Sequence, residues 1–338
     1  MDPLLLFNSY KRKLRPAHQR LCSILISLDF RQAHRSVGRK QPSSLRKGKA
    51  ISTIDDRSPG VARHDLIIRP LESSKDYEAF EDLQRGTWGQ NLSEVITASQ
   101  ARIVQRIGGI AAGAFDAQGE MLGLLFGLTG FKDGTPLHWS HMLAVRNGVR
   151  DAGIGRKLKL YQRETLLARG INRVFWTFDP LVARNAHLNF NSLGAEATEY
   201  IPDMYGPGDD SVLFQGIGTD RLVVLWRIDS DRVRRALTGS NVFDHAPYST
   251  SPLAVSRSNE VDPLSAPMSG DCSEAHAFRV EIPPDIHSLR DLSVVAAARW
   301  REVTRSTFQS CLTRGYEVAG FYRDELTGRC YYCLRLKE

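Results

Sequence analysis

A basic turn that carries two glycines is the stretch of this sequence whose residue types and spacing could do chemistry. Gly153 and Gly155 stand where a helix is expected to begin, and Arg150 precedes them in the same turn. Glycine lets a backbone approach a phosphate closely, and the first amides of a helix have no partner within it. The turn therefore indicates an anion site. The structural alternative is a solvated basic turn that packs a helix closely on a strand.

The turn differs from the two common nucleotide-binding loops. A dinucleotide fingerprint needs a third glycine and an acidic residue on a following strand, and neither is evident. A Walker loop needs Gly-Lys-Ser or Gly-Lys-Thr, which this turn lacks. The turn therefore matches neither of these two loops.

A strand and a helix must position this turn. The strand is predicted over Leu137 to Val145, because the run Met142 to Val145 is apolar. The helix is predicted to end near Arg169, with Gly170 as its C-terminal cap. Its core face is expected from residues that recur at helical spacing: Ile154, Leu158, Tyr161, Thr165 and Ala168.

Several further elements are expected before the turn. They are a strand over Asp65 to Pro70, a helix over Ser74 to Arg85 with Tyr77, Phe80 and Leu83 on one face, and strands over Gly109 to Phe115 and Met121 to Leu128. The last two strands are predicted to form a hairpin around Asp116 to Gly119.

The elements expected after the helix fall into two groups. The first comprises a strand over Arg173 to Asp179, a helix over Ala183 to Leu193 that stops at Gly194, and a strand over Leu222 to Trp226. The second comprises a strand over Phe278 to Ile282, a helix over Asp285 to Leu312, and a hairpin of Gly315 to Tyr322 with Cys330 to Leu336.

Four segments are predicted from these patterns. Residues 1–62 form a basic leader, residues 63–235 a first domain, residues 236–275 a linker rich in Ser and Pro, and residues 276–338 a β-α-β-β unit. The leader is interpreted as disordered or as the product of a misplaced start, with an organelle transit peptide as the alternative.

The order Arg-x-x-Gly-x-Gly after a strand that ends Leu-x-Val resembles the pyrophosphate-binding signature of the GNAT superfamily of acyl-CoA N-acyltransferases. The order of expected elements over residues 65–230 is similar to that family too. Within that family the chain resembles an uncharacterised subgroup with a C-terminal extension. The resemblance implies an α/β (α+β) fold, with a mixed central sheet flanked by helices and a smaller C-terminal unit.

The resemblance also implies which residues bind acetyl-CoA or another acyl-CoA as cosubstrate. Backbone groups of the strand would bind the pantetheine arm and polarise the thioester, the turn would hold the pyrophosphate, and an asparagine of the next helix would contact CoA. These residues are Leu143, Ala144, Val145, Arg150, Asp151, Ala152, Gly153, Ile154, Gly155, Arg156 and Asn185. As a residue at the start of its helix, Asn185 could equally be an ordinary N-cap.

Proton transfer needs a base and an acid. Residues 139, 141, 143 and 145 would share one face of an unbroken strand, and in the family a base often lies on that face. His141 is therefore the candidate base, with a hydrogen-bonded core histidine as the alternative. The family often has a tyrosine acid where this chain has Phe190, so Tyr205 or a water would act instead.

The predicted function is transfer of an acetyl or succinyl-type group from acyl-CoA to the amine of a small molecule. Direct attack in a ternary complex is favoured, because no Cys or Ser nucleophile stands beside a base motif. The alternative is an acyl-CoA sensor without turnover, which Phe190 favours. No metal is expected, and the acceptor and the oligomeric state stay open.

Charge and cysteine content bound the remaining possibilities. Residues 1–64 have a net charge of +10, whereas the rest of the chain has −3, so no nucleic acid is expected to bind the folded part, and a role in nucleic-acid binding stays an alternative for the leader. No apolar run is long enough to span a membrane. Five scattered cysteines argue against a disulfide framework and predict a reducing compartment, the cytoplasm. Cys330 and Cys333 are predicted to point to opposite faces of a strand.

Overall fold

The structure is a computed structural model of the 338-residue chain. It describes residues 66–90, 95–149, 152–206, 216–240, 243–258, 265, 267–270 and 275–337, all of which lie in the compact unit Asp55–Glu338. The predicted leader, residues 1–62, lies outside the described residues.

The first sheet in the described part of the chain is mixed, as predicted. Its strand order is β1-β2-β3-β4-β5-β7-β6, and of these pairs β4 with β5 is the parallel one. The strands are β1 (Ile67–Pro70), β2 (Ile110–Phe115), β3 (Met121–Lys132), β4 (Thr135–Val145), β5 (Arg173–Phe178), β6 (Glu196–Ile201) and β7 (Arg221–Arg227). The sequence did not predict β6, an edge strand in which Tyr200 alone is buried.

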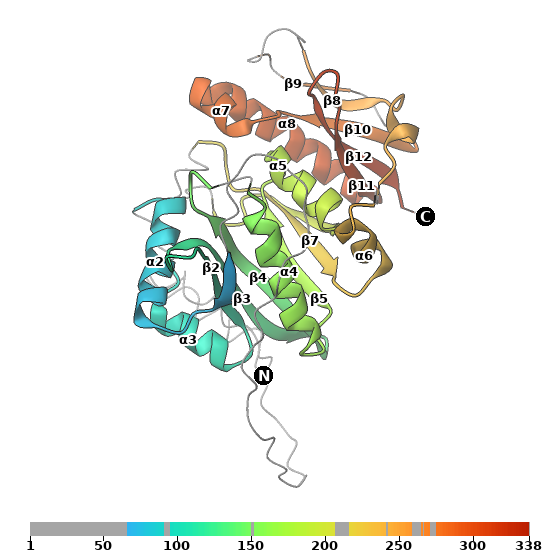
Figure 1. The fold of residues 1–338 in the computed structure, drawn as a ribbon. Coiled ribbons are helices and arrows are strands. Elements are labelled where there is room, and N and C mark those ends of the chain that lie inside the picture. The colour runs from blue at the N-terminus through green and yellow to red at the C-terminus, as the bar shows by residue number, and fades with distance from the viewer. Residues whose placement is uncertain are drawn as a thin grey trace, which may run out of the picture. The chain divides into compact units, whose positions relative to one another are not determined.

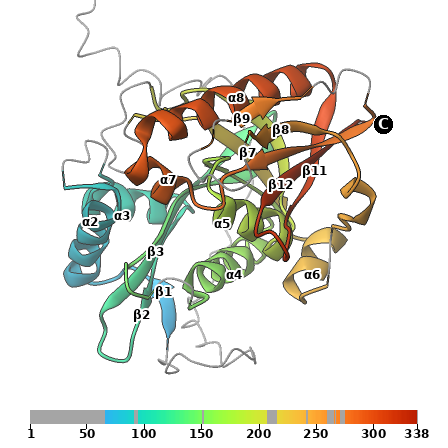
Figure 2. The same ribbon diagram turned by 90° about the horizontal axis from the view of Figure 1, so that it is seen from above.

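Helices cover both faces of this sheet (Figures 1 and 2). On one face, α2 (Ser74–Trp88) and α3 (Ala98–Arg106) share a core with β2 and β3. Tyr77, Phe80 and Leu83 of α2 are buried there, as the sequence predicted. On the other face, α4 (Ile154–Leu167) packs against β2, β3 and β4.

The core face of α4 differs from the prediction. Its buried residues are Ile154, Leu158, Lys159, Gln162 and Leu166, whereas Tyr161 and Thr165 are half-buried and Ala168 is exposed. Two polar residues, Lys159 and Gln162, occupy core positions and bond to each other at 3.1 Å. The prediction used apolar residues alone, so it placed the buried face of the helix too far round toward Tyr161 and Thr165. Gly170 has φ +73° just past the helix, which suits the predicted cap.

The predicted helix after β5 is confirmed, but its geometry changes along its length. It begins as α5 (Ala183–Ala186) and continues as a π-helix, His187–Ser192. Leu193 donates its amide to the carbonyl of Leu188, five residues earlier. Gly194 follows with φ +70°, which places the stop signal where it was predicted.

The second sheet has the strand order β11-β12-β10-β8-β9. Its strands are β8 (Leu253–Arg257), β9 (Pro267–Ser269), β10 (Ala277–Ile282), β11 (Tyr316–Arg323) and β12 (Cys330–Leu336). The segment predicted as a linker contributes β8 and β9, and α6 (Asp231–Leu237) precedes them. Short strands bounded by Ser and Pro left no alternating pattern from which to predict them.

The long helix predicted over Asp285 to Leu312 is in fact two helices, α7 (Ile286–Leu292) and α8 (Val294–Thr313). Ser293 separates them with an extended backbone, φ −157° and ψ 103°, and its side chain caps α8 by accepting from the amide of Ala296. Serine favours such caps over helix interiors, which explains the break.

One buried cluster extends from the first sheet through α8 to the second sheet. It includes Phe190 beside α5 and Tyr332 of β12. Cys330 lies in this cluster and Cys333 in a separate cluster on the opposite face of the second sheet, so the prediction for the two thiols is confirmed.

Candidate active site

The two central strands of the first sheet part at one end. β4 and β5 pair only at His138 with Val174 and at Trp139 with Phe175. Beyond these pairs β4 runs on to Val145 and β5 to Phe178, with no further pairing between them. The parted ends leave backbone edge that β5 does not cover, and this opening leads to the glycine turn.

A β-bulge lies on β4 beside the opening. Met142 pairs with Phe126 and Ser140 pairs with Gly127, which leaves His141 as the extra residue. The His141 ring lies edge-on to Phe126, with centroids 6.2 Å apart, on the face that α2 covers.

The bulge corrects the face predicted for His141. Leu143 and Val145 pack toward α4, since a Cβ placed on Gly155 would meet their side chains at 3.6 and 3.9 Å. His141 lies on the other face, so it does not share one with them. An inserted residue shifts the alternation of a strand by one position, and nothing in the sequence marks this insertion.

His138 and Ser140 are buried on the α4 side of β4. His138 is fully buried, and its Nδ1 lies 3.0 Å from the Thr129 hydroxyl. Burial, followed by the nearby Lys159 and Arg169, lowers the pKa of His138 to about 3. His138 is therefore neutral and enclosed near pH 7, which suits a packing role.

The glycine turn ends at the N-terminus of α4. Gly153 is the N-cap with φ +73°, and within the described residues no side chain caps this helix. The first amides of a helix have no partner within the helix, and this is what lets a helix N-terminus bind an anion. Arg150 and Asp151, predicted to complete the phosphate site, lie outside the described residues.

Packing does not require glycine at position 155. A Cβ there would make ordinary contacts with Leu143 and Val145, and its φ is not in the left-handed region. Gly123 differs, because a Cβ there would press at 3.1 Å on Ile154 and Leu158. Packing therefore allows a side chain at position 155, whereas glycine at position 123 lets α4 approach the sheet.

The remaining predicted ligands fall into different surroundings. Ile154 and Ala144 are buried, at 5% and 4% exposure, so backbone groups are what they can offer a ligand. Ala152 is half-buried. The Arg156 guanidinium donates to the carbonyl of Leu237 at 2.7 Å, which directs it toward α6.

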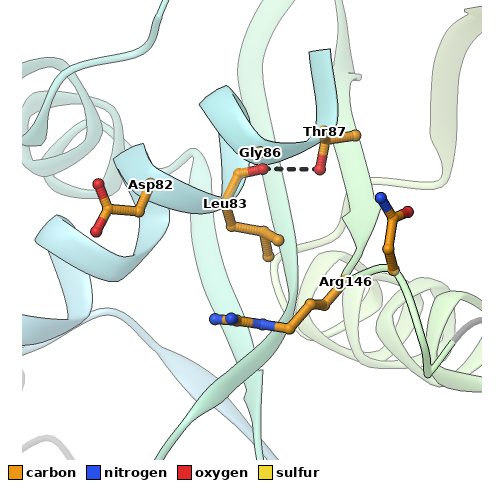
Figure 3. Close-up of a pocket in the computed structure, with 6 residues that line it drawn as sticks. Asp82, Leu83, Gly86, Thr87 and Arg146 are labelled. Atoms are coloured by element: carbon orange, nitrogen blue, oxygen red, sulfur yellow. Dashed lines mark hydrogen bonds between the residues drawn. The ribbon is translucent and has the colours of Figure 1, made fainter. Parts of the chain in front are cut away.

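A small hollow adjoins the start of the turn. Figure 3 shows Asp82, Leu83, Gly86 and Thr87 of α2 lining it together with Arg146, and Asn147 completes the lining. Arg146 follows β4 directly, and its Nε donates to the carbonyl of Met121 at 3.1 Å. The hollow brings one arginine side chain between α2 and the end of β4.

Tyr205 lies beside β5. Its side chain is 44% exposed, and its hydroxyl is 3.2 Å from that of Thr177 on β5. The guanidinium carbon of Arg221 lies 5.0 Å from the centre of its ring. The structure thus brings Tyr205 to the strand that forms one side of the opening.

Phe190 and Asn185 belong to the helix after β5. Phe190 is 1% exposed, with its ring edge-on to both Phe178 and Tyr332 at 6.0 Å. Asn185 is half-buried inside α5, and Val182 is the N-cap, so Asn185 is not the N-cap.

Sequence reasoning missed three residues at this site: Lys159, Arg146 and Thr177. Lysine reads as exposed in a helical pattern, so no signal placed Lys159 in the core. Arg146 could have been found from its position directly after a strand that feeds an anion turn. Thr177 could have been found from its place near the end of β5.

The described residues include no group of three or more His, Cys, Asp or Glu side chains placed to hold a metal ion. Among the helices that the structure describes, none is both long enough and apolar enough to cross a membrane.

No protein-family model matches the chain, and no curated relative matches its sequence. Several solved structures resemble about half of it. An aminoglycoside 6'-acetyltransferase type Ii is 20% identical, with 48% of this chain and 98% of that chain covered and a TM-score of 0.38. The ribosomal-protein-S18-alanine N-acetyltransferase from Escherichia coli is 18% identical, with 49% and 95% covered and a TM-score of 0.38.

A third structure, the NatC complex bound to Gag peptide and CoA, is 14% identical, with 48% and 98% covered and a TM-score of 0.39. At such identities and TM-scores, no activity or substrate follows for this chain. The strand order, the parallel β4–β5 pair and the turn before α4 give the first sheet and its helices the GNAT-like fold that the sequence predicted.

Proposed function

We propose that the chain is an N-acyltransferase, which moves an acetyl or succinyl-type group from acyl-CoA to the amine of a small molecule. One observation carries the proposal: the parted ends of β4 and β5 adjoin the N-terminus of α4, which no side chain of the described residues caps. An anion site and an exposed strand edge, joined by one turn, suit a ligand with a pyrophosphate and an amide-bearing arm.

The pyrophosphate would lie against the amides of the turn, from Ala152 to Arg156. The pantetheine arm would follow the β4 edge at Leu143 to Val145, where β5 no longer pairs. A backbone amide near Leu143 would then face the thioester oxygen and stabilise the charge that develops on it. Arg150 and Asp151 remain predicted parts of the pyrophosphate site.

The amine would attack the thioester carbonyl directly, forming the C–N bond as the C–S bond breaks. His141, at the bulge beside the opening, would take the proton that the ammonium group loses. The departing thiolate would take a proton from Tyr205, whose hydroxyl already contacts Thr177, or from a water. Asn185 would contact CoA from the other side of the opening.

Two properties complete the proposal. The substrate is a small-molecule amine, with no nucleic acid bound by the folded part. The compartment is the cytoplasm, which the free thiols of Cys311, Cys330 and Cys333 fit.

An acyl-CoA sensor is the second candidate. Phe190 occupies the position at which the family often has a tyrosine acid, and it is enclosed by Phe178 and Tyr332. A buried phenylalanine cannot protonate a departing thiolate. A sensor releases no thiolate, so phenylalanine at this position suits it.

Thiol release separates these candidates. Purified protein is incubated with acetyl-CoA or succinyl-CoA over a panel of amines and amino acids, and CoA binding is measured by calorimetry. We expect CoA binding and release of free thiol with a subset of amines. Binding without turnover on any acceptor would support the sensor, and absence of CoA binding would contradict both.

A further inference from the structure

A buried lysine lies where β4 and β5 part. Lys159 of α4 is 3% exposed. Its Nζ donates to the Ser140 hydroxyl of β4 at 2.8 Å and lies 3.7 Å from the centre of the Trp176 ring of β5. The last pair between β4 and β5 is Trp139 with Phe175, and Ser140 and Trp176 are the next residues on each strand. Lys159 therefore contacts both strands one residue beyond their last pair.

The surroundings of Lys159 are unusual for a lysine. Besides Ser140 it bonds to Gln162 of its own helix, and no acidic side chain of the described residues pairs with it. Burial lowers the pKa of Lys159. Enclosing an amine without a carboxylate is unfavourable, and an apolar side chain of similar length would fill the space at lower cost. Stability of the core therefore does not account for a lysine at this position.

The contacts of Lys159 continue into each strand. On β4, Ser140 directly precedes His141, the extra residue of the bulge. On β5, the Trp176 indole donates to Asn189 of the π-helix at 3.2 Å and meets Trp226 edge-on at 5.9 Å. A hydrogen bond fixes the first strand and a ring fixes the second, so one side chain sets the distance between them.

We propose that Lys159 is a positioning residue that sets the width of the β4–β5 opening and thereby fits the opening to the pantetheine arm and thioester of acyl-CoA. The inference rests on the proposed function. Lys159 itself is enclosed and does not touch the ligand. It acts through Ser140, which fixes the start of the bulge, and through Trp176, which fixes the facing strand.

Three variants test this inference. Lys159→Met keeps a side chain of similar length and apolar character but removes the amine. Ser140→Ala removes only the hydroxyl on β4 that accepts from Lys159. Leu166→Val is the matched control, because Leu166 is fully buried on the same helix, two turns beyond the opening. Melting temperatures of the three variants are measured first, so that a general loss of stability can be recognised.

CoA binding by calorimetry and steady-state kinetics form the first readout. We expect Lys159→Met to weaken CoA binding and raise KM for acyl-CoA at least about tenfold, since small misplacements at a site have effects of this size. Ser140→Ala should follow in the same direction, with KM for the amine unchanged. Leu166→Val should bind CoA as the wild type does. Wild-type CoA affinity in Lys159→Met would overturn the inference.

Amide hydrogen exchange without ligand is the second readout, and it separates failure of this inference from failure of the proposed function. Lys159→Met should speed exchange in peptides over residues 140–145 and 176–178, with the α2 peptides unchanged. Unchanged exchange at both strands would overturn the positioning role. If the wild type binds no CoA but exchange changes as expected, the proposed function fails and with it the ligand assigned to the opening.

Discussion

The β4–β5 opening and the contact of α8 with the first sheet are held by different interactions. At the opening, Lys159 meets a hydroxyl, an amide oxygen and an indole ring. At α8, Arg301 pairs with Asp179 at 2.6 Å, with side chains 4% and 2% exposed. The opening is therefore set by neutral partners, and the α8 contact by buried opposite charges.

The α8 contact reaches several connections of the first sheet. Arg305 pairs with Asp220, whose carboxylate also accepts from the Tyr200 hydroxyl, and with Asp203 at 2.8 Å. Asp179 follows β5, while Asp203 and Asp220 lie between β6 and β7. Breaking a buried charge pair leaves an uncompensated charge, whereas changing a neutral contact mainly shifts positions. We therefore expect stability to depend on α8 and ligand binding to depend on the opening.

Arg301→Met should have the largest effect. It leaves the Asp179 carboxylate buried without its partner, which costs about 3–5 kcal/mol of unfolding free energy. Urea unfolding followed by circular dichroism measures the loss.

Arg234→Met is the control for that variant. Arg234 pairs with Asp231 on the surface of α6, where both side chains are largely exposed, so its loss should cost at most about 1 kcal/mol. Equal losses for the two arginines would remove the distinction between the α8 contact and an ordinary surface pair.

Gly155→Ala should weaken CoA binding without lowering stability. The added methyl makes only ordinary contacts with Leu143 and Val145, but it would lie between the first turn of α4 and the end of β4, where CoA is proposed to bind. We expect CoA affinity to fall about tenfold, or about 1.4 kcal/mol, with a melting temperature that does not fall, because alanine favours a helix more than glycine does.

Gly130→Ala is the matched control for this variant, because a Cβ at Gly130 meets nothing and the residue lies on β3. Unchanged affinity in Gly155→Ala would show that the space above position 155 receives no ligand.

Gly153→Ala should lower stability by about 1 kcal/mol, because its φ of +73° is unfavourable for a residue with a side chain. Thermal unfolding measures this cost. Equal stability of Gly153→Ala and the wild type would mean that the turn adopts another conformation.

The last expected effect concerns the pH dependence of stability and the charge pair of Arg69 on β1 with Asp76 of α2. The hydrogen bonds from Arg69 hold the pKa of Asp76 well below its usual range, and the amides of Ser73 and Glu72 add to this. The unfolded carboxyl has a pKa near 4, so the pair stabilises the fold above about pH 4 and less as the pH falls further.

Asp76→Asn should therefore flatten the loss of stability below about pH 4, measured by urea unfolding at a series of pH values. Arg69→Met removes the partner and should flatten it too. An unchanged slope in both variants would mean that this pair does not contribute to acid unfolding.

The sequence predicted the surroundings of the β4–β5 opening better than those of the α8 contact. The strand, turn and helix around Gly153 follow from local rules of period and capping, and so do Tyr77, Phe80 and Leu83 on α2. The bulge at His141 and the polar core residue Lys159 do not, because each depends on neighbours distant in the chain.

Around α8 and the second sheet, even more of the structure depends on contacts that a local sequence pattern does not show. Serine at position 293 ends one helix and caps the next, yet the apolar pattern runs through it. The pair of Arg301 with Asp179 joins residues 122 positions apart, so no local pattern could predict it. β8 pairs with β10 as well as with β9, and its partner β10 lies about twenty residues further along the chain.

Amide hydrogen exchange of the wild-type protein with and without CoA tests the central claim most directly. CoA bound as proposed should slow exchange in peptides over residues 142–146 and 152–157 and leave peptides over residues 294–313 of α8 unchanged. If CoA slowed exchange at α8 but not at the turn, or slowed it nowhere at saturating concentration, the proposed CoA site would be contradicted.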